Sequence, residues 1–326
     1  MSWNDLMKRL VVGKQTNKNF TYQDLPHNRK QVFKFIYRNR LIEQFNAGLL
    51  AIIFFIPLFI WQILNDSLKL AVDISKLERL EIYNEYLNIL TTKNIINIPC
   101  IMFASLGLAG LVYVIRKLCF NEPVSVFKDF CKGIKNSWLQ YLTIGLILGL
   151  NVYLVDWVFN YLFYYPEVSA GLQLAFIIFT LLLTLSLFIM YMYAYGIAGL
   201  YQTNLIQIFK GAFLLTFKKF FTNVLMVIAS VLPISLWFMP FMPLIVKVIG
   251  LFVLVFGLLS CAIIVASLFI YAQFDKFINE KNYPELVNKG IYTEEIIEDE
   301  IDSVTEEEIE RLAEEIASSY DEESTE

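Results

Sequence analysis

Six long stretches of this chain contain no Asp, Glu, Lys or Arg. They cover residues 44–65, 94–115, 136–155, 168–209, 220–246 and 248–274 and are 20 to 42 residues long. The hydrocarbon core of a bilayer is about 30 Å thick, and a helix needs about 20 apolar residues to cross it. Each stretch is therefore long enough for a transmembrane helix, and a content of 57% hydrophobic and 17% charged residues argues against an ordinary soluble domain.

We predict six spans, although the longest stretch has room for two. The polar triplet at residues 202–204 interrupts that stretch and leaves too few apolar residues before Lys210 for a second crossing. Pro240 and Pro243 mark a tight turn between the fifth and sixth spans. The fold class expected is an all-α polytopic membrane protein, with spans at about residues 47–64, 97–116, 138–162, 170–196, 222–239 and 244–272.

The basic residues predict the orientation of these spans, because Lys and Arg near span ends stay preferentially on the cytoplasmic side. With six spans, 21 of the 26 basic residues fall on one side. The basic N-terminal segment 1–46 and the tail 276–326 belong to that side, so we expect both termini to be cytoplasmic. Segment 1–46 has no apolar core and cleavage site of a signal peptide, and the first span is expected to be an uncleaved anchor.

Two cytoplasmic connections, residues 126–142 and 208–225, combine aromatic residues with lysines at helical spacing. We expect each to form an elbow helix in the membrane interface, with aromatic rings in the acyl chains and lysines at the headgroups. They are either a weak internal repeat or unrelated basic connectors. The residues expected at the elbows and headgroups are Arg116, Lys117, Lys128, Asp129, Lys132, Lys210, Lys218 and Lys219.

The two remaining segments outside the spans have opposite characters. Residues 65–96 carry apolar side chains three and four apart and predict an amphipathic helix outside the membrane, either a sensing or docking element or a cap on the bundle. Residues 290–326 hold 16 of the 31 acidic residues and one basic residue. This acidic tail is expected to bind a basic cytoplasmic protein partner, to fold back on the elbows, or to stay solvated with a transient helix from Thr305.

The sequence predicts no catalytic, cofactor-binding or metal site and no nucleic-acid partner. His27 is the single histidine, and the four cysteines form no close pair. Asp156 is the one acid within a predicted span, at its outer edge, and we expect it to form an ion pair with Lys247. Gly145 and Gly149 form a GxxxG pair that permits close packing inside the bundle, with homodimerisation as the alternative.

The second predicted span and the connection after it share a pattern of glycines at 107 and 110, Arg116-Lys117-Leu118, Glu122, Phe127-Lys128-Asp129-Phe130 and Trp138. In this pattern the chain resembles the YesL-like family of bacterial integral membrane proteins, whose domain has no known function. The resemblance implies a small polytopic protein of a bacterial cytoplasmic membrane, often encoded beside carbohydrate uptake systems, and it implies no catalytic residues.

These observations lead us to expect a non-enzymatic accessory or scaffold protein that binds the lipid bilayer and contacts a partner through its tail and elbows. The alternative is a small-solute transporter or permease. A transporter requires a polar cavity at mid-membrane, and the available side chains are Asn151, Asp156, Thr180, Thr184, Ser186 and the kink at Pro233. The oligomeric state is not predicted.

Overall fold

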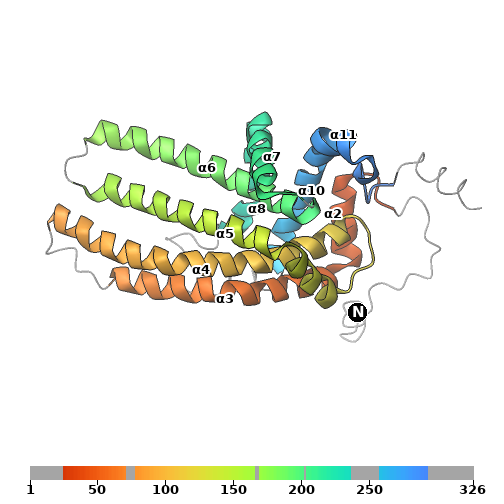
Figure 1. The fold of residues 1–326 in the computed structure, drawn as a ribbon, viewed down its shortest axis with the longest axis horizontal. Helices are drawn as coiled ribbons and strands as arrows, with labels where there is room; N and C mark the ends of the chain where they lie inside the picture. Colours follow the sequence, from red (N-terminus) through yellow and green to blue (C-terminus); the bar gives the residue numbers. More distant parts are fainter. Residues whose placement is uncertain (1–24, 71–77, 166–168, 202, 236–256, 293–326) are drawn as a thin grey trace, which may run out of the picture.

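The computed structural model describes residues 25–70, 78–165, 169–201, 203–235 and 257–292, and these ranges are helical with short connections. Four long helices lie side by side along the molecule: α3 (Leu41–Leu70), α4 (Arg79–Cys119), α5 (Val126–Tyr164) and α6 (Ala170–Leu200) (Figure 1). We name the end of the bundle at which α4 begins and α5 ends the tip. The opposite end, at the connection between α4 and α5, is the base.

Shorter elements complete the bundle near the base. α7 (Leu205–Lys218) meets α8 (Phe220–Ser235) at an angle of 99°. α10 (Leu259–Phe274) continues through the π-helix η5 (Asp275–Asn279), α11 (Glu280–Asn282) and the 3-10 helix η6 (Pro284–Leu286). α2 (Arg29–Asn39) packs beside α10 at the base (Figure 1).

The described residues include five helices long and apolar enough to cross a membrane, and α7 with α8 would form a sixth if the bent pair is one span. This confirms the expectation of an all-helical chain with the character of a multi-pass membrane protein. The predicted turn at Pro240 and Pro243, the residue Lys247 and the tail helix from Thr305 lie outside the described residues.

The expected elbow at residues 126–142 is not a separate helix, and this prediction was wrong. α5 runs unbroken from Val126 to Tyr164. Its first turns are held against α4, because Lys117 of α4 pairs with Asp129 and because the backbone at Gly133 approaches Ala109 closely. The amphipathic stretch 126–142 therefore lies along α4 as the first part of α5. The second connection does contain a separate helix, α7, which crosses the bundle direction (Figure 1).

The amphipathic helix expected within residues 65–96 is also not separate from the spans. α3 continues to Leu70, and α4 begins at Arg79 and runs into the second predicted span without a break. α4 has 41 residues and is about 60 Å long, about twice the thickness of a bilayer core. A helix does not have to end where the lipid ends, because water satisfies side chains beyond it and the backbone hydrogen bonds are internal.

Close packing joins α4 and α5 through glycines of α5. A Cβ atom built on Gly133 would lie 2.8 Å from the carbonyl oxygen of Ala109 and 2.5 Å from Cβ of Tyr113. Cβ atoms on Gly145 and Gly149 would lie 3.0 Å and 3.1 Å from the Cα atoms of Met102 and Ile98. The predicted GxxxG pair thus faces a helix of the same chain, as small residues do where two helix backbones meet.

Candidate functional sites at the two ends of the bundle

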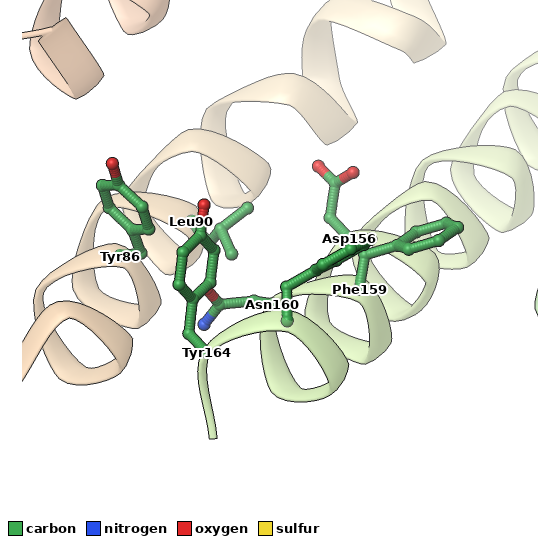
Figure 2. A pocket seen from close by; sticks show the side chains of 7 residues that line it. Tyr86, Leu90, Asp156, Phe159, Asn160 and Tyr164 are labelled. Carbon is green, nitrogen blue, oxygen red and sulfur yellow. The ribbon is translucent and has the colours of Figure 1, made fainter. Parts of the chain in front are cut away.

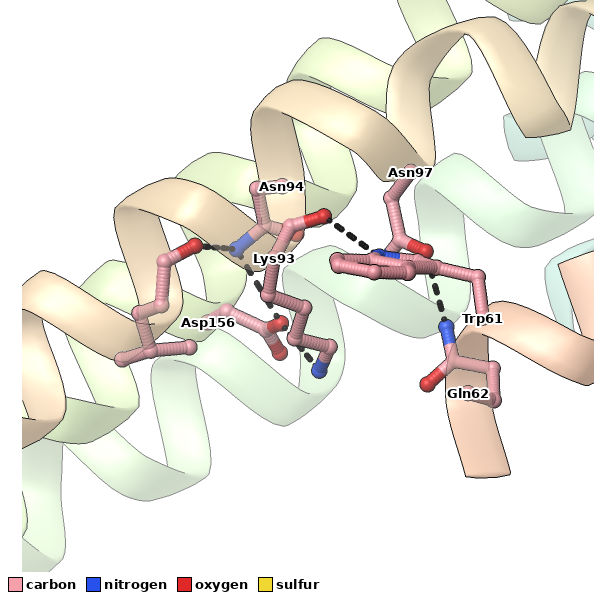
Figure 3. Close-up of polar contacts among 7 residues, drawn as sticks. Trp61, Gln62, Lys93, Asn94, Asn97 and Asp156 are labelled. Atoms are coloured by element: carbon pink, nitrogen blue, oxygen red, sulfur yellow. Dashed lines mark hydrogen bonds and ion pairs between the residues drawn. The ribbon is translucent and has the colours of Figure 1, made fainter. Parts of the chain in front are cut away.

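An ion pair joins α4 to α5 toward the tip. Lys93 Nζ lies 3.0 Å from Asp156 Oδ2, and the two side chains are 13% and 28% exposed (Figure 3). Asn94 Nδ2 approaches the same carboxylate oxygen at 3.5 Å. Asp156 was expected to pair with Lys247, which lies outside the described residues. Within the described part of the chain, the cation on Asp156 is Lys93.

Asparagines that follow Lys93 continue this polar layer toward α3. Asn94 and Asn97 are each 1% exposed, one helical turn apart. Gln62 Nε2 donates to Asn97 Oδ1 at 3.0 Å, and Trp61 Nε1 donates to the Lys93 carbonyl at 3.0 Å (Figure 3). Asn94 and Asn97 were not among the polar residues singled out from the sequence, because they begin the charge-free stretch 94–115, which was assigned to a span. The spacing of two asparagines one turn apart, next to a lysine at a span boundary, was the available signal.

The polar layer holds buried atoms without partners. Asn94 Oδ1, Asn97 Nδ2 and Asn160 Oδ1 are three of the five buried side-chain polar atoms that lack a hydrogen bond among the described residues. Buried polar atoms in folded proteins are almost always satisfied by protein or by ordered water. These three atoms therefore mark a place where water or a ligand completes the structure.

A cavity of about 210 Å³ opens between α4 and α5 next to Asp156 (Figure 2). The rings of Tyr86 and Tyr164 meet edge to face across it, with centroids 4.9 Å apart. Asn160 lies one helical turn beyond Asp156 on the same face of α5, is 4% exposed, and donates from Nδ2 to the Tyr83 carbonyl at 3.4 Å. The cavity thus has aromatic walls and polar groups from a single face of α5.

At the base, the residues expected at the first elbow take two different roles. Lys117 Nζ lies 3.0 Å from both carboxylate oxygens of Asp129, whose Oδ2 also accepts from the Ser125 backbone N–H at 2.8 Å. This pair closes the turn between α4 and α5. Arg116 points into the bundle instead, where its guanidinium stacks 4.5 Å from the Tyr113 ring centroid and donates to the Gly199 carbonyl at 3.2 Å.

The remaining lysines predicted at the elbows are exposed. Lys128 and Lys132 lie on the first turns of α5, and Lys210 lies on α7. Lys218 and Lys219 lie at the end of α7 with their ammonium groups 3.6 Å and 5.8 Å from the Phe277 ring centroid. Apolar side chains of α7 are exposed beside them, including Ile206 (82%) and Phe213 (55%). A helix with exposed lysines and exposed apolar residues is typical of a membrane interface.

The segments before the first span and after the last one are joined at the base. The Tyr292 backbone N–H donates to the Pro26 carbonyl at 3.0 Å. Arg29 pairs with Asp275 at 2.5 Å and donates to the Lys289 carbonyl at 3.1 Å. We call these contacts, together with the ion pair between Lys289 and Glu122, the terminal clasp. None of these pairs was predicted from the sequence, because the partners lie far apart in the chain and share no periodicity.

The clasp is anchored on the turn between α4 and α5. Lys289 Nζ lies 2.8 Å from Glu122 Oε1, and Arg40 donates to the Glu122 carbonyl at 2.6 Å. Gly290 has φ of +81°, which favours glycine, and a Cβ there would lie 2.3 Å from the Cys119 carbonyl oxygen. The residues after η6 are thus fitted closely against the end of α4.

The polar residues that would support a transporter do not gather in one place among the described residues. Asn151 donates to the Tyr191 hydroxyl. Thr184 and Ser186 donate to carbonyls of their own helix, at Thr180 and Leu182. Asp156 belongs to the layer toward the tip. Side-chain bonds within a helix satisfy the hydroxyls locally, so they do not require a polar pathway.

No family model, no curated protein and no solved structure matches this chain. Among the described residues, no three His, Cys, Asp or Glu side chains lie close enough together to hold a metal ion.

Proposed function

We propose that this protein is a non-enzymatic accessory or scaffold component of a bacterial cytoplasmic membrane, with both termini cytoplasmic and a partner bound at the base. The terminal clasp is the observation that carries the proposal. It holds Pro26 against Tyr292 and thereby starts both terminal segments, residues 1–24 and the acidic tail, from one point of the base. A chain that only had to cross a bilayer would not need to tie these two segments together.

Charged layers at both ends support the placement of the bundle across the bilayer. Lys93 toward the tip and Arg116 at the base are separated by 23 residues of one helix, or about 35 Å at 1.5 Å per residue. This length exceeds the hydrocarbon core of about 30 Å by a small margin. The exposed lysines Lys128, Lys132 and Lys210 would then face the anionic headgroups of the cytoplasmic leaflet.

The partner should present a basic surface, because the acidic residues of the chain are concentrated in the tail. Beyond Tyr292, residues 293–326 contain 16 acidic residues and one basic residue. Such a segment attracts a basic surface over a distance of about one Debye length, about 8 Å at physiological salt. The partner complex is therefore expected to weaken as the salt concentration rises.

The test compares two truncations of the full chain, purified from its membrane in mild detergent. Removing residues 293–326 leaves the terminal clasp intact, whereas removing residues 284–326 also removes the contacts of Lys289 and Tyr292. We expect the full chain to retain one stoichiometric protein partner, identified by mass spectrometry, and both truncations to lose it. A chain that carries no stoichiometric partner, or a partner that survives both truncations, would overturn the proposal.

The transporter alternative has weaker support, because its polar side chains are spread over separate contacts in the described residues. Uptake of a solute into vesicles that contain the purified protein would revive it. The link to carbohydrate uptake that the family resemblance implies stays a prediction.

A further inference from the structure

The cavity between α4 and α5 combines two properties that water alone does not require. It is walled by aromatic rings, those of Tyr86, Phe159 and Tyr164, and it contains the polar groups of Asp156 and Asn160 (Figure 2). At about 210 Å³ it has the volume of about seven water molecules at about 30 Å³ each. This is below the range of drug-sized sites and fits a small organic molecule.

The two polar groups have acceptor capacity that the described residues leave unused. Asn160 Oδ1 is buried and has no hydrogen-bond partner. Both contacts of Asp156 among the described residues, from Lys93 and Asn94, are to Oδ2, which leaves Oδ1 as an acceptor. The two residues are four apart on α5, so their side chains lie one above the other, about 6 Å apart at Cβ. Figure 2 shows the Asp156 carboxylate and the Asn160 amide pointing in different directions, so a ligand that donates to either oxygen would use acceptor capacity that the described residues leave free.

The charge of the lining selects among donor ligands. Among the described residues, the lining contains one carboxylate and no Lys or Arg; Lys93 reaches Asp156 from outside the lining and offsets part of its charge. Aromatic faces attract cations within about 6 Å of the ring centroid, and hydrogen bonds from a cation to a carboxylate are stronger than neutral ones. The carboxylate, the amide oxygen and the ring faces therefore all favour a cationic ligand.

We propose that this cavity binds a small organic ammonium compound, with the ammonium group beside Asp156 and Asn160 and its apolar part against the aromatic rings. The site lies beyond Lys93 toward the tip, in the parts of α4 and α5 that extend past a bilayer-length segment. A ligand reaches it from the solution at the tip and does not cross the membrane. The proposal is independent of the scaffold function, which concerns the base.

Binding is measured by isothermal titration calorimetry on the full chain in lipid nanodiscs, with three probes. Phenethylammonium carries the charge and an aromatic ring, 2-phenylethanol has nearly the same shape without the charge, and glucose is a neutral polyol. We expect saturable binding of phenethylammonium and at least about tenfold weaker binding of 2-phenylethanol, because one charged hydrogen bond accounts for about a factor of ten. We expect no binding of glucose.

Variants locate the binding in the cavity. Asn160→Leu removes the unpartnered oxygen, and Phe159→Leu removes one ring without a change in charge; each should weaken phenethylammonium binding about tenfold or more. The matched controls are Asn136→Leu and Phe127→Leu, which change the same residue types at exposed positions near the base and should bind as the unchanged protein does. Circular dichroism and gel filtration show that each variant is folded.

Four results would overturn the proposal. Equal affinity for phenethylammonium and 2-phenylethanol would make the cavity a purely apolar pocket. Binding of glucose alone would assign it to neutral polyols. Binding that is the same in Asn160→Leu, Phe159→Leu and their controls would place the probe elsewhere in the nanodisc. The absence of saturable binding by all three probes would mean that water satisfies Asn160.

Discussion

Gly133, Gly145 and Gly149 of α5 face α4, and we call them the glycine seam. Their different distances from α4 predict graded losses of stability on substitution. Replacement of Gly133 by Ala would put a methyl group 2.8 Å from the carbonyl oxygen of Ala109 and 2.5 Å from Cβ of Tyr113. A backbone oxygen and a Cβ atom cannot rotate away, so the two helices must separate. At Gly145 and Gly149 the nearest backbone atoms are 3.0 Å and 3.1 Å away, so the required backbone shift is smaller, and the closest atom to Gly145 is the side-chain oxygen of Ser105 at 2.5 Å.

The expected losses follow this order. Overpacking of a tight contact costs about 1–3 kcal/mol, and an alanine in a helix returns up to about 1 kcal/mol relative to glycine. We expect Gly133→Ala to lose about 2 kcal/mol of unfolding free energy, Gly145→Ala about 1–2 and Gly149→Ala about 1 or less. Gly171→Ala is the matched control, because no atom lies within 4 Å of its Cβ position, and it should be neutral or slightly stabilising.

Unfolding of the purified protein in mixed micelles, titrated with sodium dodecyl sulfate and followed by far-UV circular dichroism, measures these differences. The same series tests whether the seam acts within one chain, since none of the variants should change the oligomeric state. If Gly133→Ala is as stable as Gly171→Ala, or if the order of the three seam variants is reversed, then α4 and α5 do not pack as described.

Three further predictions concern the ends of the bundle. In a double-mutant cycle, Lys93→Met and Asp156→Asn should each lose about 1–3 kcal/mol of unfolding free energy, because each single change leaves one partly buried polar group unpaired. The double variant should lose less than the sum of the two. Additive losses in the unfolding titration would show that the pair is not coupled. With Cys131 as the sole cysteine, a membrane-impermeant maleimide should label the protein in inverted vesicles but not in intact cells. With Asn84→Cys as the sole cysteine, the pattern should be the opposite. Labelling of Cys131 in intact cells would contradict the predicted topology. Gly290→Ala should lower the unfolding free energy by about 3 kcal/mol or more, because it adds left-handed backbone strain to a contact of 2.3 Å with a carbonyl oxygen. Unchanged thermal unfolding would show that the residues of the terminal clasp do not pack against α4 as described.

The helical architecture was predictable from the sequence because it depends on one local property. A stretch without charges is a necessary condition for a span, and the boundaries at Lys93, Arg116 and Asp156 agree with charged layers found in the structure. The lengths of the helices were not predictable in this way. A charge ends a charge-free stretch but does not end a helix, so α4 and α5 continue through Lys93 and Lys135.

The sites were less predictable because they depend on pairs far apart in the chain. Asp156 was recognised as an unusual acid, but its partner Lys93 is 63 residues away and became visible only through the packing of α4 on α5. The terminal clasp joins Arg29 to Asp275, 246 residues apart. Pairs this far apart produce no repeating pattern in the sequence. The acid was predictable from its rarity in a span, and the partner required the fold.

The glycine seam also constrains how the two ends can act. Gly133, Gly145 and Gly149 cover 17 residues of α5, about 25 Å along the helix, and they fit against one register of α4. A slide of one helix past the other would bring side chains into backbone contacts of 3.1 Å or less, and packed interfaces accept discrete arrangements rather than continuous displacement. The polar layer toward the tip and the terminal clasp at the base are therefore fixed to the ends of a single rigid pair of helices. Differences in what the two ends bind must come from the side chains presented there, because the shape of the α4–α5 pair is already set by its glycines.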